Sequence, residues 1–243
     1  MDSHAGPLNV RPSRIEQLEA DFASLAPQLP DSAERKALSV LHGMVQELWR
    51  IQVSGNARQV RSGPTIDDIV YLHEHAPPME GDAVNTPLAV GEPAPDFALP
   101  DANGRTIRLS DYRGRRVVLA FYPLDWSPGC SRQLDLYQHE LDEFRKRGAE
   151  VMGISVDSLY SHGAWAAVRG LTFPLLADFN PKGDVARRYK VWREADGFSE
   201  RALYIVDENG IIRHAQVSPK LQHVPDIYEL LNALDQLATA KAA

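Results

Sequence analysis

Cysteine is nearly absent from this sequence: the chain has one in 243 residues, at position 130. A single cysteine excludes an internal disulfide, and it excludes a structural zinc site made of several thiolates. A disulfide oxidoreductase of the Cys-x-x-Cys type is excluded as well, because the 243 residues contain no second thiol. Any sulfur chemistry of this chain that needs a thiol therefore belongs to Cys130.

Long apolar runs and an excess of positive charge are also missing. No run approaches the ~20 residues of a membrane-spanning helix, and the start, MDSHAGPLNVRPSR, has no apolar core of signal-peptide length. The 26 Lys and Arg stand against 33 Asp and Glu, a net charge of −7. We therefore expect neither nucleic acid nor a membrane as a partner. Without an export signal or a disulfide, the expected compartment is cytoplasmic.

The first 87 residues are predicted to form helices that end in a linker. Ser13 and Glu16 have the spacing of a capping box, and apolar residues follow at helical intervals. Residues 76–95 are rich in Pro and Gly, which is typical of a linker. We therefore divide the chain into a helical N-terminal extension over residues 1–87 and a second domain over residues 88–243.

The second domain alternates extended apolar segments with helical ones. Asn103-Gly104 and Asn209-Gly210 each lie between two extended runs, which predicts two hairpins. The other expected elements, in chain order, are a buried strand at RRVVLAFYP, a helix over 127–148, a strand at EVMGISVD, a helix near 158–169 that leads to FPLLAD, and helices near 183–189 and 224–238. This order predicts an α/β domain, with a mixed central sheet covered by helices.

The single cysteine ends the segment FYPLDWSPGC at residues 121–130. Ser127 is a good N-cap, Pro128 suits the first helical position, and Gly129 allows a close approach to the backbone. Cys130 would then be the third residue of a helix, beside backbone N–H groups that have no partner in the helix. The positive end of the helix dipole favours a thiolate there, which predicts a reactive cysteine.

A packed structural cysteine is the competing interpretation of Cys130. Leu134, Tyr137, Leu141 and Phe144 form the inward stripe of the expected helix, and Cys130 precedes Leu134 by four residues on the same side. The spacing alone leaves both interpretations open. The Ser-Pro-Gly approach favours the reactive thiolate, because core packing needs neither a proline nor a glycine before the thiol.

FYPLDWSPGC resembles the active-site segment of the peroxiredoxin family (AhpC/TSA-like). The family pattern is Pro, three residues, Thr or Ser, two residues and Cys, which here falls on Pro123, Ser127 and Cys130. The similarity extends over about residues 88–238 and includes GISVDS, FPLLAD and SERALYIVDENGIIRH. In the last of these segments, the arginine that faces the cysteine in the family corresponds to Arg201. The resemblance implies a thioredoxin-like fold, in agreement with the order of elements.

The resemblance also implies a thiol-dependent peroxidase with Cys130 as its nucleophile. The N–H groups of Gly129 and Cys130, the Ser127 hydroxyl and the Arg201 guanidinium would hold the two peroxide oxygens, and Pro123 would shield the thiolate from water. The implied substrates are hydrogen peroxide or organic hydroperoxides. No cofactor is expected beyond an external thiol reductant, either a thioredoxin-like protein or a low-molecular-weight thiol. A homodimer remains an open alternative to a monomer.

Three positions depart from the family pattern. Trp126 stands where the family usually has Phe, and Gln133 stands where many members have Glu, which would replace an ion pair with the arginine by a neutral hydrogen bond. Relatives with the PGC segment often carry a second, resolving cysteine five residues after the first, where this chain has Asp135. The resemblance is therefore to a one-cysteine peroxiredoxin, in which no intramolecular disulfide can form.

A hydrolase, a metal site and a redox-sensing module are the alternatives to the peroxidase. A Cys–His hydrolase could use His139 or His162, but no segment resembles a thiol-protease signature. His73-Glu74-His75 suggests a metal site less well than a solvated helix end, so no metal is expected. A non-enzymatic thioredoxin-fold module that senses redox state or binds a partner through Cys130 shares the first step with the peroxidase. Turnover of excess peroxide distinguishes the two.

Overall fold

The computed structural model describes Phe22 and residues 76–242. The chain divides into two compact units, residues 1–62 and 63–243, and residues 76–242 belong to the second. The capping box predicted at Ser13 and the histidines at 73 and 75 lie outside the described residues.

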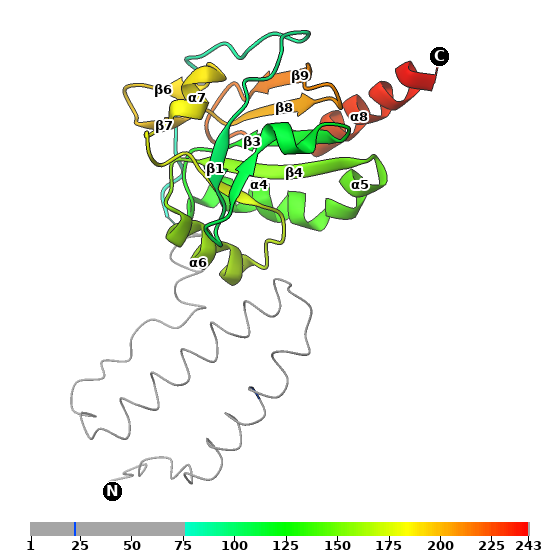
Figure 1. Cartoon of the computed structure of the whole chain (residues 1–243). Helices are drawn as coiled ribbons and strands as arrows, with labels where there is room; N and C mark the ends of the chain where they lie inside the picture. The colour runs from blue at the N-terminus through cyan, green and yellow to red at the C-terminus, as the bar shows by residue number, and fades with distance from the viewer. Residues whose placement is uncertain (1–21, 23–75, 243) are drawn as a thin grey trace, which may run out of the picture. The chain divides into compact units, whose positions relative to one another are not determined.

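A five-stranded mixed sheet forms the centre of this unit, in the order β5-β4-β3-β8-β9 (Figure 1). Its strands are β3 (Arg116–Phe121), β4 (Ala149–Ser155), β5 (Leu175–Ala177), β8 (Ala202–Val206) and β9 (Ile212–Val217). The first three run parallel, while β8 and β9 are antiparallel to their neighbours. All six residues of β3 are buried, as expected for an apolar strand covered on both faces. This confirms the predicted α/β class and mixed sheet.

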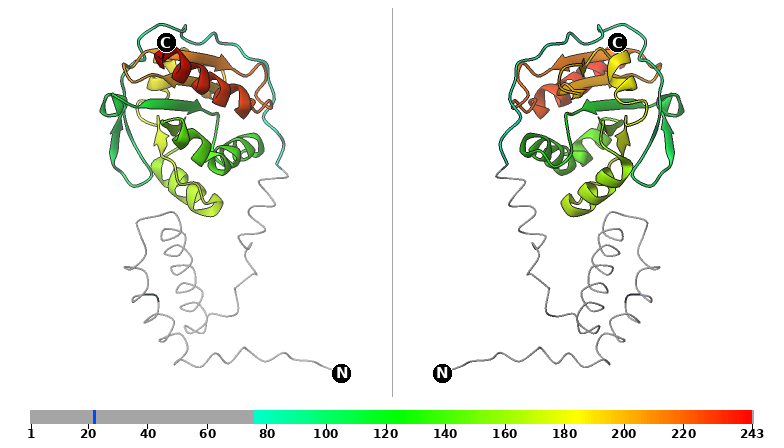
Figure 2. Two further views of the ribbon diagram at one scale, coloured as in Figure 1. Left: turned by 90° about the vertical axis from the view of Figure 1, so that its right-hand side faces the viewer. Right: turned by 90° about the vertical axis from the view of Figure 1, so that its left-hand side faces the viewer.

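Helices cover both faces of the sheet. They are α4 (Pro128–His139), α5 (Leu141–Lys146), α6 (Leu159–Arg169), α7 (Asp184–Arg188) and α8 (Ile227–Ala242). Leu134 of α4 and Leu230 of α8 belong to one core cluster, together with Val118 of β3. Val185 of α7 belongs to the other cluster, together with Leu119. The two views in Figure 2 show α8 and α7 on opposite faces of the sheet.

Smaller elements complete the unit. They are β1 (Ala98–Pro100), β2 (Thr106–Arg108), η2 (Leu109–Tyr112), β6 (Trp192–Arg193) and β7 (Phe198–Ser199). β1 pairs with β2, and β8 with β9, as the two Asn-Gly hairpins predicted. The helix predicted over 127–148 is instead two helices, because the backbone of Glu140 (ψ 12°) leaves the helical range. Leu141 and Phe144 still belong to the same core cluster as Leu134.

The segment just before the second domain is bonded to that domain. Asp82 forms a β-bridge with Lys220, and the Val84 N–H donates to the Glu200 carboxylate at 2.8 Å. The Asn85 amide donates to the same carboxylate at 3.1 Å. Residues 82–85, which the sequence placed in a linker, are therefore fixed against the domain.

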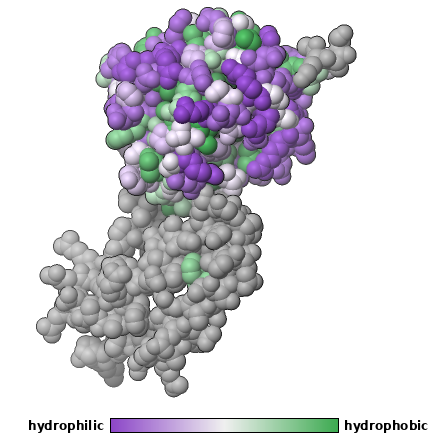
Figure 3. Space-filling view, in the orientation of Figure 1, coloured by the Kyte–Doolittle hydropathy of each residue, from purple (hydrophilic) through white to green (hydrophobic). Residues whose placement is uncertain are grey.

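The surface of the described unit is mostly hydrophilic on the face shown in Figure 3, with apolar residues scattered singly. Among residues 76–242, no helix has the length and apolar character needed to cross a membrane.

Candidate active site

Cys130 lies in the first turn of α4, directly after the loop that follows β3. Ser127 has the extended backbone of an N-cap (φ −69°, ψ 143°), and its hydroxyl oxygen accepts from the Cys130 N–H at 3.4 Å. Pro128 is the first helical residue and Cys130 the third. The local structure predicted from Ser-Pro-Gly-Cys is therefore confirmed.

The Cys130 side chain is completely buried, with 0% exposed, and it belongs to the same core cluster as Leu134 and Tyr137. Its burial is what the structural interpretation of this cysteine predicted. Its sulfur also has a charged neighbour, because Nη2 of Arg201 lies 3.5 Å from Sγ. A cysteine that served only as packing would not need a guanidinium at this distance.

Arg201 is buried to 1% exposure at the start of β8, the strand that pairs with β3. Its Nε donates to the carbonyl oxygen of Leu221 at 2.9 Å, and its Nη1 donates to Oε1 of Gln133. The neutral hydrogen bond expected from Gln133 is thus present. No carboxylate forms an ion pair with Arg201 among the described residues.

Gln133 is held in turn by Tyr137. The Gln133 amide donates to the Tyr137 hydroxyl oxygen at 2.9 Å. Burial raises the pKa of Tyr137 well above its usual value, so the phenol stays neutral at physiological pH. Tyr137, Gln133, Arg201 and Cys130 therefore form one buried chain of contacts. The sequence indicated the last three but gave no signal for the Tyr137 hydroxyl.

Of the two remaining site residues, Gly129 lies directly against Arg201, whereas Pro123 lies in the preceding loop. A Cβ atom added to Gly129 would lie 2.9 Å from Nη2 of Arg201, closer than real Cβ contacts allow, so glycine leaves room for the guanidinium. Pro123 is buried in the loop between β3 and α4. The structure therefore brings Ser127, Gly129, Cys130 and Arg201 together, with Pro123 in the loop that leads to them.

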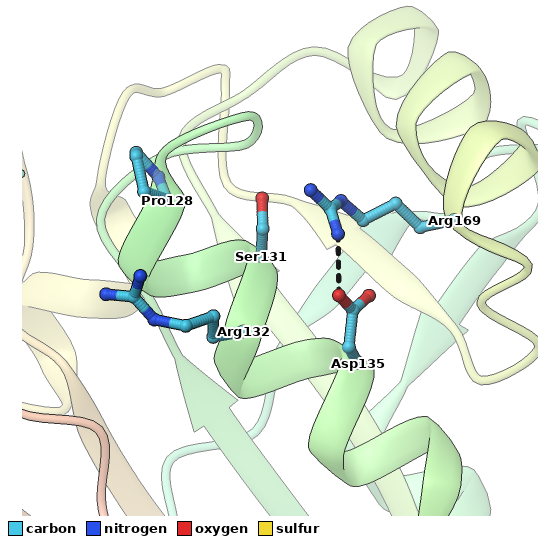
Figure 4. A pocket seen from close by; sticks show the side chains of 5 residues that line it. All are labelled: Pro128, Ser131, Arg132, Asp135 and Arg169. Atoms are coloured by element: carbon cyan, nitrogen blue, oxygen red, sulfur yellow. Dashed lines mark hydrogen bonds and ion pairs between the residues drawn. The ribbon is translucent and has the colours of Figure 1, made fainter. Parts of the chain in front are cut away.

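A pocket lies where the first turns of α4 approach Arg169 at the end of α6, and Cys130 is not among its lining residues (Figure 4). Its lining residues are Pro128, Ser131, Arg132, Asp135 and Arg169. Arg132 is exposed there, two positions after the cysteine, while Arg169 pairs with Asp135 at 2.6 Å. The position where relatives carry a second cysteine thus holds one half of an ion pair.

Neither histidine considered for a hydrolase is a hydrogen-bond partner of Cys130 in the described part of the chain. His139 lies at the end of α4 with 83% of its side chain exposed, and Nδ1 of the buried His162 faces Asp125 at 2.9 Å. The arrangement therefore lacks the Cys–His pair of a thiol hydrolase. Between residues 76 and 242, no cluster of three or more His, Cys, Asp or Glu side chains is placed to hold a metal ion.

Comparison with known proteins places the chain in a family. Residues 90–215 match the model of the AhpC/TSA family, which is more than half of the chain. The fold and this match together define a thiol-dependent peroxidase of the thioredoxin-like class. The chain belongs to the AhpC/TSA family, the peroxiredoxins.

Individual relatives agree with this family. The chain is 41% identical over 131 residues to alkyl hydroperoxide reductase E of Mycobacterium tuberculosis, covering 54% of this chain and 86% of the relative. It is 39% identical over 140 residues to peroxiredoxin-1 of Gallus gallus, covering 53% and 69%.

Solved structures show the same fold. Reduced 2-Cys peroxiredoxin of Plasmodium vivax aligns with a TM-score of 0.59 at 28% identity, covering 64% of this chain and 85% of the other. Peroxidoxin BcpB of Mycobacterium tuberculosis aligns with a TM-score of 0.56 at 28% identity, covering 61% and 97%. The thioredoxin-like fold expected from the sequence is confirmed.

Proposed function

We propose that this protein reduces hydrogen peroxide or organic hydroperoxides through Cys130 alone and is recycled by an external thiol. The observation that supports this most directly is the position of Arg201, whose Nη2 lies 3.5 Å from the sulfur in a site closed to water. A buried guanidinium without a carboxylate partner favours a negative charge on the neighbouring thiol. The first turn of α4 adds its dipole to the same effect.

In the first step, the Cys130 thiolate attacks one oxygen of the peroxide along the O–O axis. The S–O bond forms as the O–O bond breaks, and the second oxygen leaves as hydroxide or alkoxide with the electron pair. The developing charge on that oxygen needs fixed donors. Arg201, the Ser127 hydroxyl and the N–H groups of Gly129 and Cys130 are the donors of this site. The Cys130 N–H is available, because its bond to Ser127 is long at 3.4 Å.

The surrounding residues exclude water from the thiolate. Pro123 is buried in the loop between β3 and α4, and it has no N–H group that would attract a water molecule. Gly129 permits Arg201 to approach the helix. A dry site strengthens the interaction of the guanidinium with the thiolate and with the leaving oxygen.

In the second step, an external thiolate attacks the sulfur of the Cys130 sulfenic acid and releases hydroxide, which leaves a mixed disulfide. A second thiol then attacks that disulfide and releases the Cys130 thiolate. The reductant is a thioredoxin-like protein or a low-molecular-weight thiol, since these residues contain no other cysteine. A lone cysteine suits a reducing compartment, so we assign the reaction to the cytoplasm. We also propose a homodimer, which light scattering would test.

The test is a peroxide-consumption assay on the full chain with dithiothreitol or a thioredoxin system as reductant. Many turnovers per Cys130, abolished in Cys130→Ser, support the peroxidase. Intact mass should rise by one oxygen after one equivalent of peroxide. A small thiol should then give the mixed disulfide, whose mass is that of the sulfenic acid plus one thiol less one water. Consumption of only one equivalent under every reductant would instead indicate a redox-sensing module. Efficient turnover through a Cys130–Cys130 dimer would refute the external thiol.

A further inference from the structure

A buried polar cluster joins the active-site loop to α6. The carboxylate of Asp125, in the loop between β3 and α4, accepts from the Tyr122 hydroxyl at 2.8 Å and from the Ser161 hydroxyl at 2.7 Å. Nδ1 of His162 lies 2.9 Å from the same carboxylate. The side chains of Asp125 and His162 are both 0% exposed. Two side chains 37 positions apart therefore form a wholly buried acid–imidazole pair.

The direction of these hydrogen bonds follows from the groups involved. A carboxylate only accepts, so Nδ1 of His162 carries the hydrogen that points to Asp125. Burial raises the pKa of Tyr122 well above its usual value, which keeps its hydroxyl a donor. Asp125 thus receives three donors, and removal of any one leaves part of a buried carboxylate without a partner.

Other contacts hold the same short loop. The Asp125 N–H donates to the Asp157 carboxylate at 2.8 Å, and Nε1 of Trp126 donates to the Ser161 hydroxyl at 3.3 Å. Trp126 has a φ of +64°, in the left-handed region that side chains other than glycine rarely adopt. This backbone is maintained only where neighbouring contacts compensate for its cost. The bonds to Ser161 and Asp157, and the packing of Trp126 on Trp165, are contacts of this kind.

The held loop leads directly into the peroxidatic site. Ser127 follows Trp126 without an intervening residue, and its hydroxyl accepts from the Cys130 N–H. A shift of the loop would therefore move Ser127 and the first turn of α4 relative to Arg201. The reacting atoms of an enzyme must be placed within a fraction of an ångström, so such a shift would slow the attack on peroxide.

We propose that His162 is a positioning residue of the peroxidase, and that it acts through Asp125 to hold Ser127 and Cys130 against Arg201. The inference rests on the proposed function. It carries a second consequence, because the sulfur is completely buried and an external thiol must reach it. Loosening the loop slows oxidation of Cys130 by peroxide and speeds reduction of the oxidised form by a small thiol. A residue that only stabilised the fold would not move these two rates in opposite directions.

Four variants of the full chain test this. His162→Leu removes the donor to Asp125, while His162→Asn restores an N–H group near the position of Nδ1. Ser161→Ala is a milder change, since it removes one donor from a half-buried position. His139→Asn is the matched control, because His139 lies on α4 with its side chain exposed and is not part of the buried cluster. Circular dichroism and thermal unfolding establish that each variant is folded.

Two stoichiometric rates are measured for each variant by acid quench and intact mass. These are oxidation of reduced Cys130 by one equivalent of hydrogen peroxide, and reduction of the oxidised form by dithiothreitol. His162→Leu should slow the first by about 10- to 100-fold and raise the second. His162→Asn should recover most of both, Ser161→Ala should change both in the same directions by less, and His139→Asn should match the unmodified chain.

Unchanged oxidation in folded His162→Leu would overturn the proposal, and so would equal slowing of both rates. If His162→Leu does not fold, Ser161→Ala and His162→Asn take its place. Wild-type rates in Ser161→Ala would overturn the proposal, whereas slower oxidation and faster reduction of Cys130 in that variant would support it. Failure of the proposed function is a separate result. It would appear in the unmodified chain as absence of turnover, whereas the two rates compared here need only one oxidation and one reduction of Cys130.

Discussion

Replacing Arg201 by methionine removes the guanidinium beside Cys130 while keeping an unbranched side chain in a wholly buried position. Nη2 of Arg201 lies 3.5 Å from the sulfur. Coulomb's law at an effective dielectric constant of about 20 gives about 5 kcal/mol for two unit charges at that separation, which is an upper bound. The net value of a hydrogen bond to a charged group is about 1.5–3 kcal/mol. A factor of ten in rate corresponds to about 1.4 kcal/mol. Removing the guanidinium should therefore slow alkylation of Cys130 at neutral pH by about 10- to 100-fold.

The sign follows from the charges. Arg201 stabilises the negative charge of the attacking sulfur, so its loss slows attack on any electrophile. The variant also loses a donor to the leaving oxygen, and loss of one such donor slows an enzyme by about 10²-fold or more. The peroxide rate should therefore fall further than the alkylation rate. Iodoacetamide labelling at neutral pH, followed by intact mass, measures the alkylation rate. Stopped-flow mixing with hydrogen peroxide measures the rate.

Two controls separate charge from packing. Arg201→Lys keeps a positive charge but loses the fork that bonds Leu221 and Gln133, so it should recover part of the alkylation rate and little of the peroxide rate. Arg132→Ala removes an exposed arginine two residues from the cysteine and should change neither rate. A folded Arg201→Met variant with unchanged alkylation and peroxide rates would refute the reasoning.

Three further predictions follow from particular side chains. Gln133→Glu places a carboxylate on Arg201, and its negative charge near the sulfur should slow both alkylation and the peroxide reaction in the assays above. Burial raises the pKa of Asp178 to about 6, above the 3.8 of an unfolded chain, so the folded state holds the extra proton between these values. Stability should therefore fall as pH rises from about 4 to 6, by at most ~1.4 kcal/mol per pH unit, and urea unfolding of Asp178→Asn should lack this slope. A chain that begins at Ala76 should keep Cys130 reactivity. Removal of residues 76–85 as well should lower its melting temperature, because Oε1 of Glu200 loses the donors Val84 and Asn85.

The parts of the structure that could be predicted depend on short-range rules. The two Asn-Gly turns specify hairpins within a few residues, and Ser127-Pro128 specifies where α4 begins, because a cap satisfies N–H groups only two or three positions away. The break at Glu140 could not be predicted this way. The helical pattern continues across it, since Leu141 and Phe144 fall on the same inward stripe as Leu134 and belong to the same core cluster.

Sequence periodicity could not predict contacts between residues that lie far apart in the chain. Arg201 lies 71 positions from Cys130, and nothing in its local sequence distinguishes it from a surface charge at a strand end. It was indicated only by resemblance to the family. Asp125 gave a weaker signal, as a charged residue inside an apolar segment. Its partner His162 was considered only as the base of a hydrolase, because the 37-residue separation concealed the pairing that topology creates.

Burial of Cys130 serves the two halves of the proposed cycle in opposite ways. A dry site with Arg201 against the sulfur favours the thiolate and its attack on a molecule as small as hydrogen peroxide. The same closure hinders any thiol that must reach the oxidised sulfur, and no second cysteine in these residues can reach it from within. Until a thiol reduces it, the sulfenic acid can react with a second peroxide, which would convert it to sulfinic acid. The loop at Asp125 is the element of the structure whose looseness sets the balance between these fates, since it determines both how well the sulfur is aligned and how readily it is uncovered.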